Sequence, residues 1–151
     1  MSSTDRIEKS KLLRAPLSRV FRALTDAREL GAWFGVRLEG EISPGAHLRG
    51  RITNEGYEAL TMEIWVEEVE PERRFSYRWH PFAVDPAVDY SAEPTTLVEI
   101  TLAEAPGGTL LTVVESGFDA VPAARRAKAF EMNGEGWGIQ MVQIERYLDA
   151  A

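Results

Sequence analysis

The chain has 151 residues, a formal net charge of −7 at neutral pH and no cysteine. Its length suggests a single domain, 1–151, and its 44% hydrophobic and 27% charged residues are typical of an ordinary soluble protein rather than a disordered one. The acidic charge argues against non-specific binding to nucleic acid or to an anionic membrane. The lack of cysteine excludes disulfides and thiolate metal sites. No signal stretch or spanning segment is visible, so we expect a cytoplasmic protein.

The N-terminal part predicts one strand followed by two short helices. Residues 6–14 fit an edge strand that ends before Pro16. Proline suits the first turn of a helix because its missing N–H has no helical partner there, and apolar residues at helical spacing follow it. Asp26 and Glu29 then fit a capping box for a second short helix, which ends near Gly35.

The middle of the chain has the alternation of apolar and polar residues that is typical of strands. Strands are predicted over 36–42, 47–53, 60–69, 75–80, 98–102 and 111–115. Val69 is out of phase with the residues before it, which predicts a β-bulge near Glu67 and Glu68. Pro106-Gly107-Gly108 has the composition of a hairpin turn.

The C-terminal stretch from Pro122 to Leu148 predicts the longest helix of the chain. At 1.5 Å per residue it would run roughly 40 Å, the width of a domain this size, so much of the fold must lie against it. Its apolar stripe consists of Phe130, Gly134, Trp137, Met141, Ile144 and Leu148. Gly134, Gly136 and Gly138 allow two interpretations: a bend or break in the helix, or room for a facing surface or a ligand.

The order of the elements predicts an α+β fold. Grouped strands followed by a long helix imply an antiparallel sheet of six or seven strands with one buried face, which the helix covers. The two short helices after the first strand complete the predicted architecture.

Short motifs spread over nearly the whole chain carry a resemblance to a known family. They are Ala15-Pro16, Leu24-Thr25, Trp33-Phe34, Pro44-Gly45, Glu70-Pro71-Glu72-Arg73-Arg74-Phe75, Gly108-Thr109, Glu115-Ser116-Gly117-Phe118 and Gly136-Trp137. In this order they resemble the activator of heat-shock protein 90 ATPase-like branch of the START/Bet v 1-like superfamily, also called SRPBCC or polyketide cyclase-like. The resemblance implies a helix-grip fold with a deep cavity between sheet and helix. It does not select a function, because relatives include lipid carriers, hormone receptors, cyclases and co-chaperone domains.

The expected ligand cavity combines one face of the sheet with the helix stripe. Its predicted lining is Phe75, Tyr77, Trp79, Val98, Ile100, Val113, Glu115, Trp137 and Met141. Ordinary core packing would explain the apolar members equally well. Glu115 is either a solvated carboxylate at an exposed strand end or a polar anchor inside the cavity, where a partner such as Arg78 or a tyrosine hydroxyl would offset the burial of its charge.

The segment 81–94 is long for a hairpin loop and contains three prolines. Its apolar residues Phe82, Val84, Val88 and Tyr90 suggest a lid over one mouth of the cavity. The alternative is a loop packed on the sheet edge. His47 and His80 are the only histidines, and we expect His80 on the sheet surface. No metal site, cofactor or catalytic motif is predicted.

Three functions fit these patterns. The favoured one is a binding module that holds a small hydrophobic or aromatic molecule. The second is a chaperone-interacting stress-response protein, although the eukaryotic co-chaperone that this branch resembles pairs the domain with a separate N-terminal one. The third is a cyclase- or hydrolase-like acid–base enzyme that uses Glu115 and Tyr77, although no paired acid–base motif is present.

The outer face of the long helix suggests a possible homodimer. Met132, Ile139 and Val142 project away from the predicted buried stripe and form a small apolar patch, which Glu135 interrupts. A two-fold interface through this patch is one interpretation. The other is that the residues have no function, since scattered exposed apolar side chains are normal.

Overall fold

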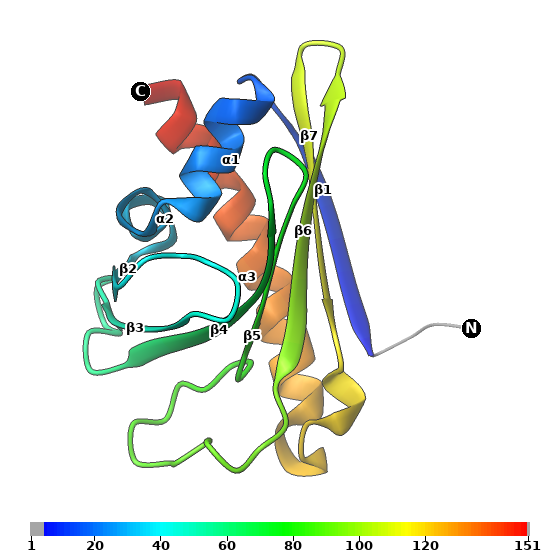
Figure 1. The fold of residues 1–151 in the computed structure, drawn as a ribbon. Helices are drawn as coiled ribbons and strands as arrows, with labels where there is room; N and C mark the ends of the chain where they lie inside the picture. Colours follow the sequence, from blue (N-terminus) through cyan, green and yellow to red (C-terminus); the bar gives the residue numbers. More distant parts are fainter. Residues whose placement is uncertain (1–4, 151) are drawn as a thin grey trace.

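The computed structural model describes residues 5–150 as a curved antiparallel sheet that wraps around a long C-terminal helix (Figure 1). The elements are β1 (Arg6–Leu13), α1 (Leu17–Thr25), α2 (Ala27–Phe34), β2 (Val36–Glu39), β3 (His47–Ile52), β4 (Thr61–Glu70), β5 (Arg74–Trp79), β6 (Thr96–Ala105), β7 (Gly108–Ser116), the 3-10 helix η1 (Phe118–Ala120) and α3 (Ala123–Ala150). The seven strands lie in the order β1-β7-β6-β5-β4-β3-β2. The predicted α+β helix-grip architecture is confirmed.

The two short helices form as predicted, but only half of the capping box does. The Asp26 side chain accepts a hydrogen bond from the Glu29 N–H at 3.0 Å and so caps α2. The Asp26 N–H donates to the carbonyl of Arg22, and the Glu29 carboxylate turns toward Arg19 on α1. The helix α2 ends at Gly35, whose φ of 90° is a left-handed conformation that glycine adopts without steric cost.

The strands follow the apolar alternation, with one predicted irregularity and one shortened strand. The register between β4 and β5 shifts between Val66 and Glu68, which confirms the bulge. The strand predicted over 36–42 is shorter than expected, because β2 ends at Glu39 and the chain turns at Gly40, where φ is 112°. The buried residues of β4 to β7 face the helices and form the core with them.

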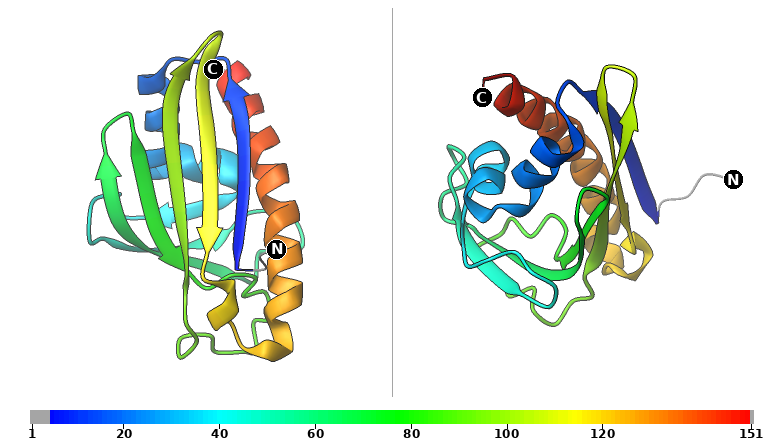
Figure 2. Two further views of the ribbon diagram at one scale, coloured as in Figure 1. Left: turned by 90° about the vertical axis from the view of Figure 1, so that its right-hand side faces the viewer. Right: turned by 45° about the horizontal axis from the view of Figure 1, so that its top comes forward.

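The helix α3 runs without interruption from Ala123 to Ala150, so of the two interpretations of its glycines the one that places a break in the helix is wrong. It lies along the edge of the sheet that β1 forms, while the rest of the sheet curls around it (Figure 2). Trp137, Met141 and Ile144 are buried, and Phe130 and Leu148 pack against the core at partial exposure. No helix within 5–150 is long and apolar enough to cross a membrane.

Candidate functional site

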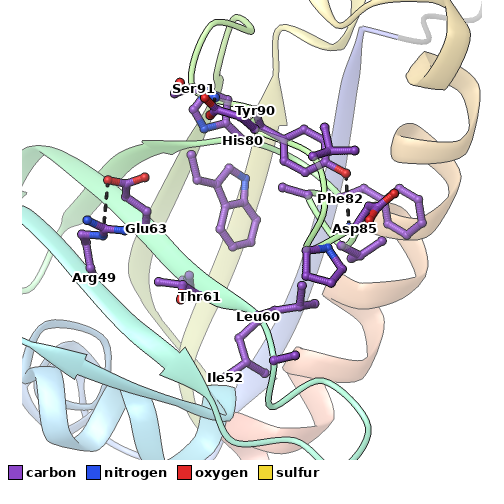
Figure 3. A pocket seen from close by; sticks show the side chains of 18 of the residues that line it. Arg49, Ile52, Leu60, Thr61, Glu63, His80, Phe82, Asp85, Tyr90 and Ser91 are labelled. Carbon is purple, nitrogen blue, oxygen red and sulfur yellow. Dashed lines mark hydrogen bonds and ion pairs between the residues drawn. The ribbon is translucent and has the colours of Figure 1, made fainter.

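A pocket of about 470 Å³ lies at the end of the sheet where the β5–β6 loop crosses it (Figure 3). One wall is this loop, including all four residues predicted as a lid: Phe82, Val84, Val88 and Tyr90. The other walls come from the end of β3, the loop before β4 and the start of β4. Figure 3 shows Phe82 and Tyr90 on the loop side and Ile52 and Leu60 opposite them.

Side chains from three further elements complete the pocket. They are Phe34 at the end of α2, Trp79 at the end of β5 and Asn133 on α3. Trp79 is the one predicted cavity residue on the pocket wall. No pattern in the sequence indicated Phe34 or Asn133 as a site residue. Asn133 lies four residues before Trp137 and so shares its helix face, which is the signal that could have found it.

The charged groups around the pocket are predominantly acidic. Three carboxylates, Glu63, Asp85 and Asp89, line it together with a single arginine, Arg49. Glu63 forms an ion pair with Arg49 at 3.7 Å and a hydrogen bond with His47 Nε2 at 2.5 Å. The backbone N–H of Ser91 lowers the pKa of Asp89, so this exposed carboxylate stays charged at neutral pH. The pocket therefore has an acidic rim around an apolar interior.

Arg125, in the first turn of α3, holds the β5–β6 loop in place. Its Nη1 donates to the carbonyls of Pro81 and Phe82 at 2.8 and 3.1 Å, and its Nε donates to Glu93 Oε1 at 2.9 Å. Its guanidinium carbon lies 4.7 Å from the centre of the Tyr90 ring, within cation–π range. One side chain thus contacts both ends and the middle of the loop, which lies beside the start of α3 in Figure 1.

The loop also carries local backbone strain. Phe82 has a φ of 50°, a left-handed conformation that costs a residue with a side chain of order 1 kcal/mol or more. The carbonyls on either side of this φ angle, those of Pro81 and Phe82, both accept hydrogen bonds from Arg125. These charge-assisted hydrogen bonds offset the strain.

His80 begins the loop and lines the pocket. The edge of its ring packs on Trp65 at 5.6 Å, and His47 stacks on the same indole at 4.9 Å. The two histidines are therefore neighbours of one tryptophan despite their separation in sequence.

Beneath the pocket lies Glu115, which is fully buried. This burial excludes the interpretation of a solvated strand end. The carboxylate accepts hydrogen bonds from Trp79 Nε1 at 2.7 Å, Trp137 Nε1 at 2.8 Å and Thr96 Oγ1 at 2.6 Å. The amide nitrogen of Asn133 donates to both carboxylate oxygens, at 3.0 and 3.1 Å. Five hydrogen bonds from neutral groups thus satisfy this carboxylate.

The expected partners of Glu115 do not supply these bonds. Arg78 pairs with Glu67 at 2.6 Å instead. Burial, and next the negative charge of Glu115, raise the pKa of Tyr77 well above its usual value of 10.0. Tyr77 is therefore a neutral phenol at physiological pH.

An aromatic cluster connects the pocket to this carboxylate. The rings of Trp79 and Trp137 lie 5.8 Å apart, and Phe34 meets both edge-on at 6.0 and 6.3 Å. The remaining predicted cavity residues lie deeper, in the buried core: Phe75, Tyr77, Val98, Ile100, Val113 and Met141. Of the residues predicted to line a cavity, Trp79 alone is on the wall of this pocket, and the others are packed in the buried interior.

A second buried carboxylate, Glu29, has a different environment. It pairs with Arg19 at 2.7 Å and Arg22 at 2.9 Å, and it accepts a hydrogen bond from Tyr147 Oη at 2.7 Å. Burial by itself would raise the pKa of Glu29, but the hydrogen bonds from Tyr147 and Arg19 and the two positive charges lower it overall. These bonds join α1, α2 and α3, away from the pocket.

A curved antiparallel sheet that grips a long helix, with a pocket at one end of the grip, defines the chain as a helix-grip domain of the SRPBCC, or polyketide cyclase-like, class. The family model described as Activator of Hsp90 ATPase homolog 1-like protein matches residues 14–149. The chain belongs to this family. No curated protein matches it.

Solved structures support the same assignment. Protein MLL2253 from Mesorhizobium loti is 25% identical, with a TM-score of 0.75 over 97% of this chain and 98% of that one. DynU16, from the dynemicin biosynthetic locus, is 28% identical, with a TM-score of 0.73; the match covers 96% of this chain but 47% of DynU16. Protein NE0264 from Nitrosomonas europaea shares the fold, with 21% identity and a TM-score of 0.76 over 99% and 97% of the two chains.

Proposed function

We propose that this protein is a binding module for a small hydrophobic or aromatic molecule, which it holds in the pocket beneath the β5–β6 loop. The observation that carries the proposal is the pocket itself: about 470 Å³, lined by Phe82 and Tyr90 of the loop and by Phe34 and Trp79 of the framework. Ligand sites commonly combine such apolar and aromatic walls with a few polar groups. In this proposal Trp137 and Glu115 form the layer behind the site, and the predicted core residues support it from below.

The family and one neighbour support a small-molecule role. DynU16 comes from a biosynthetic locus, and its match to this chain spans about half of its length. The helix-grip class accommodates ligands between sheet and helix; this pocket lies at the end of the sheet, with Asn133 of α3 among its lining residues. The natural ligand of this chain is therefore sought among small organic molecules.

An acid–base enzyme that uses Glu115 and Tyr77 has less support. The Glu115 carboxylate is occupied by hydrogen bonds from four neighbouring side chains and does not line the pocket. The raised pKa of Tyr77 keeps its proton in place at neutral pH, so it is a poor general base. Neither group has the access that proton transfer to a bound substrate requires.

Fluorescence titration with a neutral apolar probe, N-phenyl-1-naphthylamine, tests the proposal. We expect saturable binding to the native protein. Ala83 lines the pocket, so Ala83→Trp should fill it and weaken binding at least tenfold. Ala87 lies exposed on the same loop outside the pocket, and Ala87→Trp should leave binding unchanged. Equal binding by both variants, or no binding by the native protein to this and other neutral apolar probes, contradicts the proposal.

A further inference from the structure

We infer that Asn133 selects ligands that bring a hydrogen-bond donor, a hydroxyl or an amine, to the inner end of the pocket, and that the site rejects carboxylates. This inference rests on the proposed function and specifies the chemical class of its ligand. It follows from the orientation of one amide, from the charge behind that amide and from the charges at the rim.

The orientation of the Asn133 amide is set by Glu115. A carboxylate offers only acceptors, so the Nδ2 end of the amide must face it, and Nδ2 lies 3.0 and 3.1 Å from the two oxygens. The donors of Trp79, Trp137 and Thr96 complete the shell around this carboxylate. Asn133 also lines the pocket, and its Nδ2 is engaged by Glu115, so in this inference its Oδ1 acceptor is the end of the amide that meets the ligand. A ligand donor complements this atom, whereas a ligand acceptor does not.

The electrostatic field reinforces this selection. The four side chains that donate to Glu115 are all neutral, so the hydrogen bonds stabilise its negative charge without cancelling it. A charge in this low-dielectric layer acts on the pocket more strongly than it would in water. At the rim, the single arginine, Arg49, is paired with Glu63, and Asp85 and Asp89 add further negative charge. An anionic ligand therefore meets repulsion from both ends of the pocket.

The apolar surfaces position the rest of the ligand. Phe34 and Trp79 form the framework side and Phe82 and Tyr90 the loop side, so a flat aromatic body can stack between them. A donor attached to that body reaches Asn133 from the pocket side. Glu115 is then a positioning residue, which acts through Asn133 and not by contact with the ligand.

Four naphthalene probes of similar size test the inference by isothermal titration calorimetry. The donors are 1-naphthol and 1-naphthylmethylammonium; 1-methoxynaphthalene has no donor, and 1-naphthoate is an anionic acceptor. We expect the two donors to bind at least about tenfold tighter than 1-methoxynaphthalene, and 1-naphthoate to bind weakest, since one hydrogen bond to a desolvated group corresponds to a factor of this size. If 1-methoxynaphthalene or 1-naphthoate binds as tightly as 1-naphthol, the inference is overturned and the proposed function stands. If no neutral probe binds, the result contradicts both this inference and the proposed function.

Two variants connect the selectivity to the residues. Asn133→Leu should remove the preference for 1-naphthol over 1-methoxynaphthalene, while affinity of the folded variant for 1-methoxynaphthalene stays within about threefold because the apolar walls of the pocket remain. The substitution also removes the two hydrogen bonds from Asn133 to Glu115, so circular dichroism first checks that the variant is folded. Glu115→Gln offers donors as well as acceptors, so the Asn133 amide is free to reverse. This variant should reduce the preference for 1-naphthol and improve the binding of 1-naphthoate, changes that a purely structural role of Glu115 would not produce. Retention of the native selectivity by either folded variant overturns the inference.

Discussion

Glu115 and Glu29 are both buried, yet the groups around them differ. Glu29 is balanced by two arginines and a tyrosine hydroxyl, so its ion pairs join three helices. Glu115 is held by neutral donors next to the pocket. A buried carboxylate without a cation is costly unless hydrogen bonds satisfy it, and such groups are concentrated at functional sites. This difference is why we assign Glu115 to the binding site and Glu29 to stability.

Trp137 supports the fold through its ring and through its bond to Glu115. Trp137→Ala should lower the free energy of unfolding by about 3–5 kcal/mol, because it empties a buried site and removes one donor from a buried carboxylate. Urea denaturation followed by circular dichroism measures the change. Trp65→Ala is the control, since Trp65 is only half-buried and should cost less. A loss below about 1 kcal/mol for Trp137→Ala would show that the ring is not part of the core.

The Glu29 cluster should make stability depend on acidic pH. Its pKa is lowered from 4.5 in the native state, so folding favours the ionised form. The stability that the ionised Glu29 carboxylate contributes is therefore fully present above about pH 4.5, and it is lost as the pH falls through the lowered pKa of the native state. Glu29→Gln should lower stability at pH 7 and flatten its decline between pH 5 and pH 3. Urea denaturation across this range tests the prediction, and parallel pH profiles for the two proteins would contradict it.

At the scale of elements, α3 contains glycines whose small size serves no packing need in this structure. A Cβ at Gly138 meets no described atom within 4 Å, and the position is exposed. Gly138→Ala should therefore raise the free energy of unfolding by about 0.5–1 kcal/mol through helix propensity. Gly31→Ala is the contrast, because the added Cβ would lie 2.1 Å from the carbonyl oxygen of Val36. This clash should disturb the packing of α2 on β2 and lower the free energy of unfolding. Thermal unfolding of both variants checks the opposite signs.

The β5–β6 loop should open more readily without Arg125. Arg125→Ala removes the bonds to Pro81, Phe82 and Glu93, which should ease local opening by about 1–3 kcal/mol. Hydrogen exchange of the amides in 82–93 should then be about tenfold faster or more, while the sheet amides of β6 and β7 keep their protection. Arg146→Ala, on an exposed part of α3, is the control. Unchanged exchange in the loop would show that Arg125 does not hold it.

The elements could largely be predicted from the sequence, because each depends on a local period. The apolar alternation from Leu60 to Val66 is sufficient to predict β4, and the break in that alternation at Val69 is sufficient to predict its bulge. The pocket could be predicted only in part. Its loop was found from its length and apolar residues, but Phe34 and Asn133 reach it from other elements, and no local pattern reports which side chains meet across a fold. The uninterrupted course of α3 through its glycines likewise depends on tertiary packing, which overrides propensity.

At the scale of the whole molecule, the outer face of α3 offers a surface for self-association. Ile139 is 63% exposed and Val142 39% exposed. We expect a two-fold dimer through this patch that tightens with salt, since each copy carries a net charge of −7. Light scattering at micromolar concentration should show the dimer for the native chain and a monomer for Ile139→Glu. A native monomer at low and high salt, or a dimer that survives the substitution, contradicts this expectation.

The pairing of β1 with β7 bears on how the chain reaches this structure during synthesis. The register joins Arg6 to Ser116 and Leu13 to Thr109, so the first strand has its sheet partner about a hundred residues further along. Closing so large a loop costs entropy before any contact compensates for it, and folds with many such contacts form slowly. Until β7 has been made, β1 has no strand beside it, and its backbone donors and acceptors remain open to other chains. A nascent chain of this protein therefore carries an unpaired N-terminal strand through most of its translation.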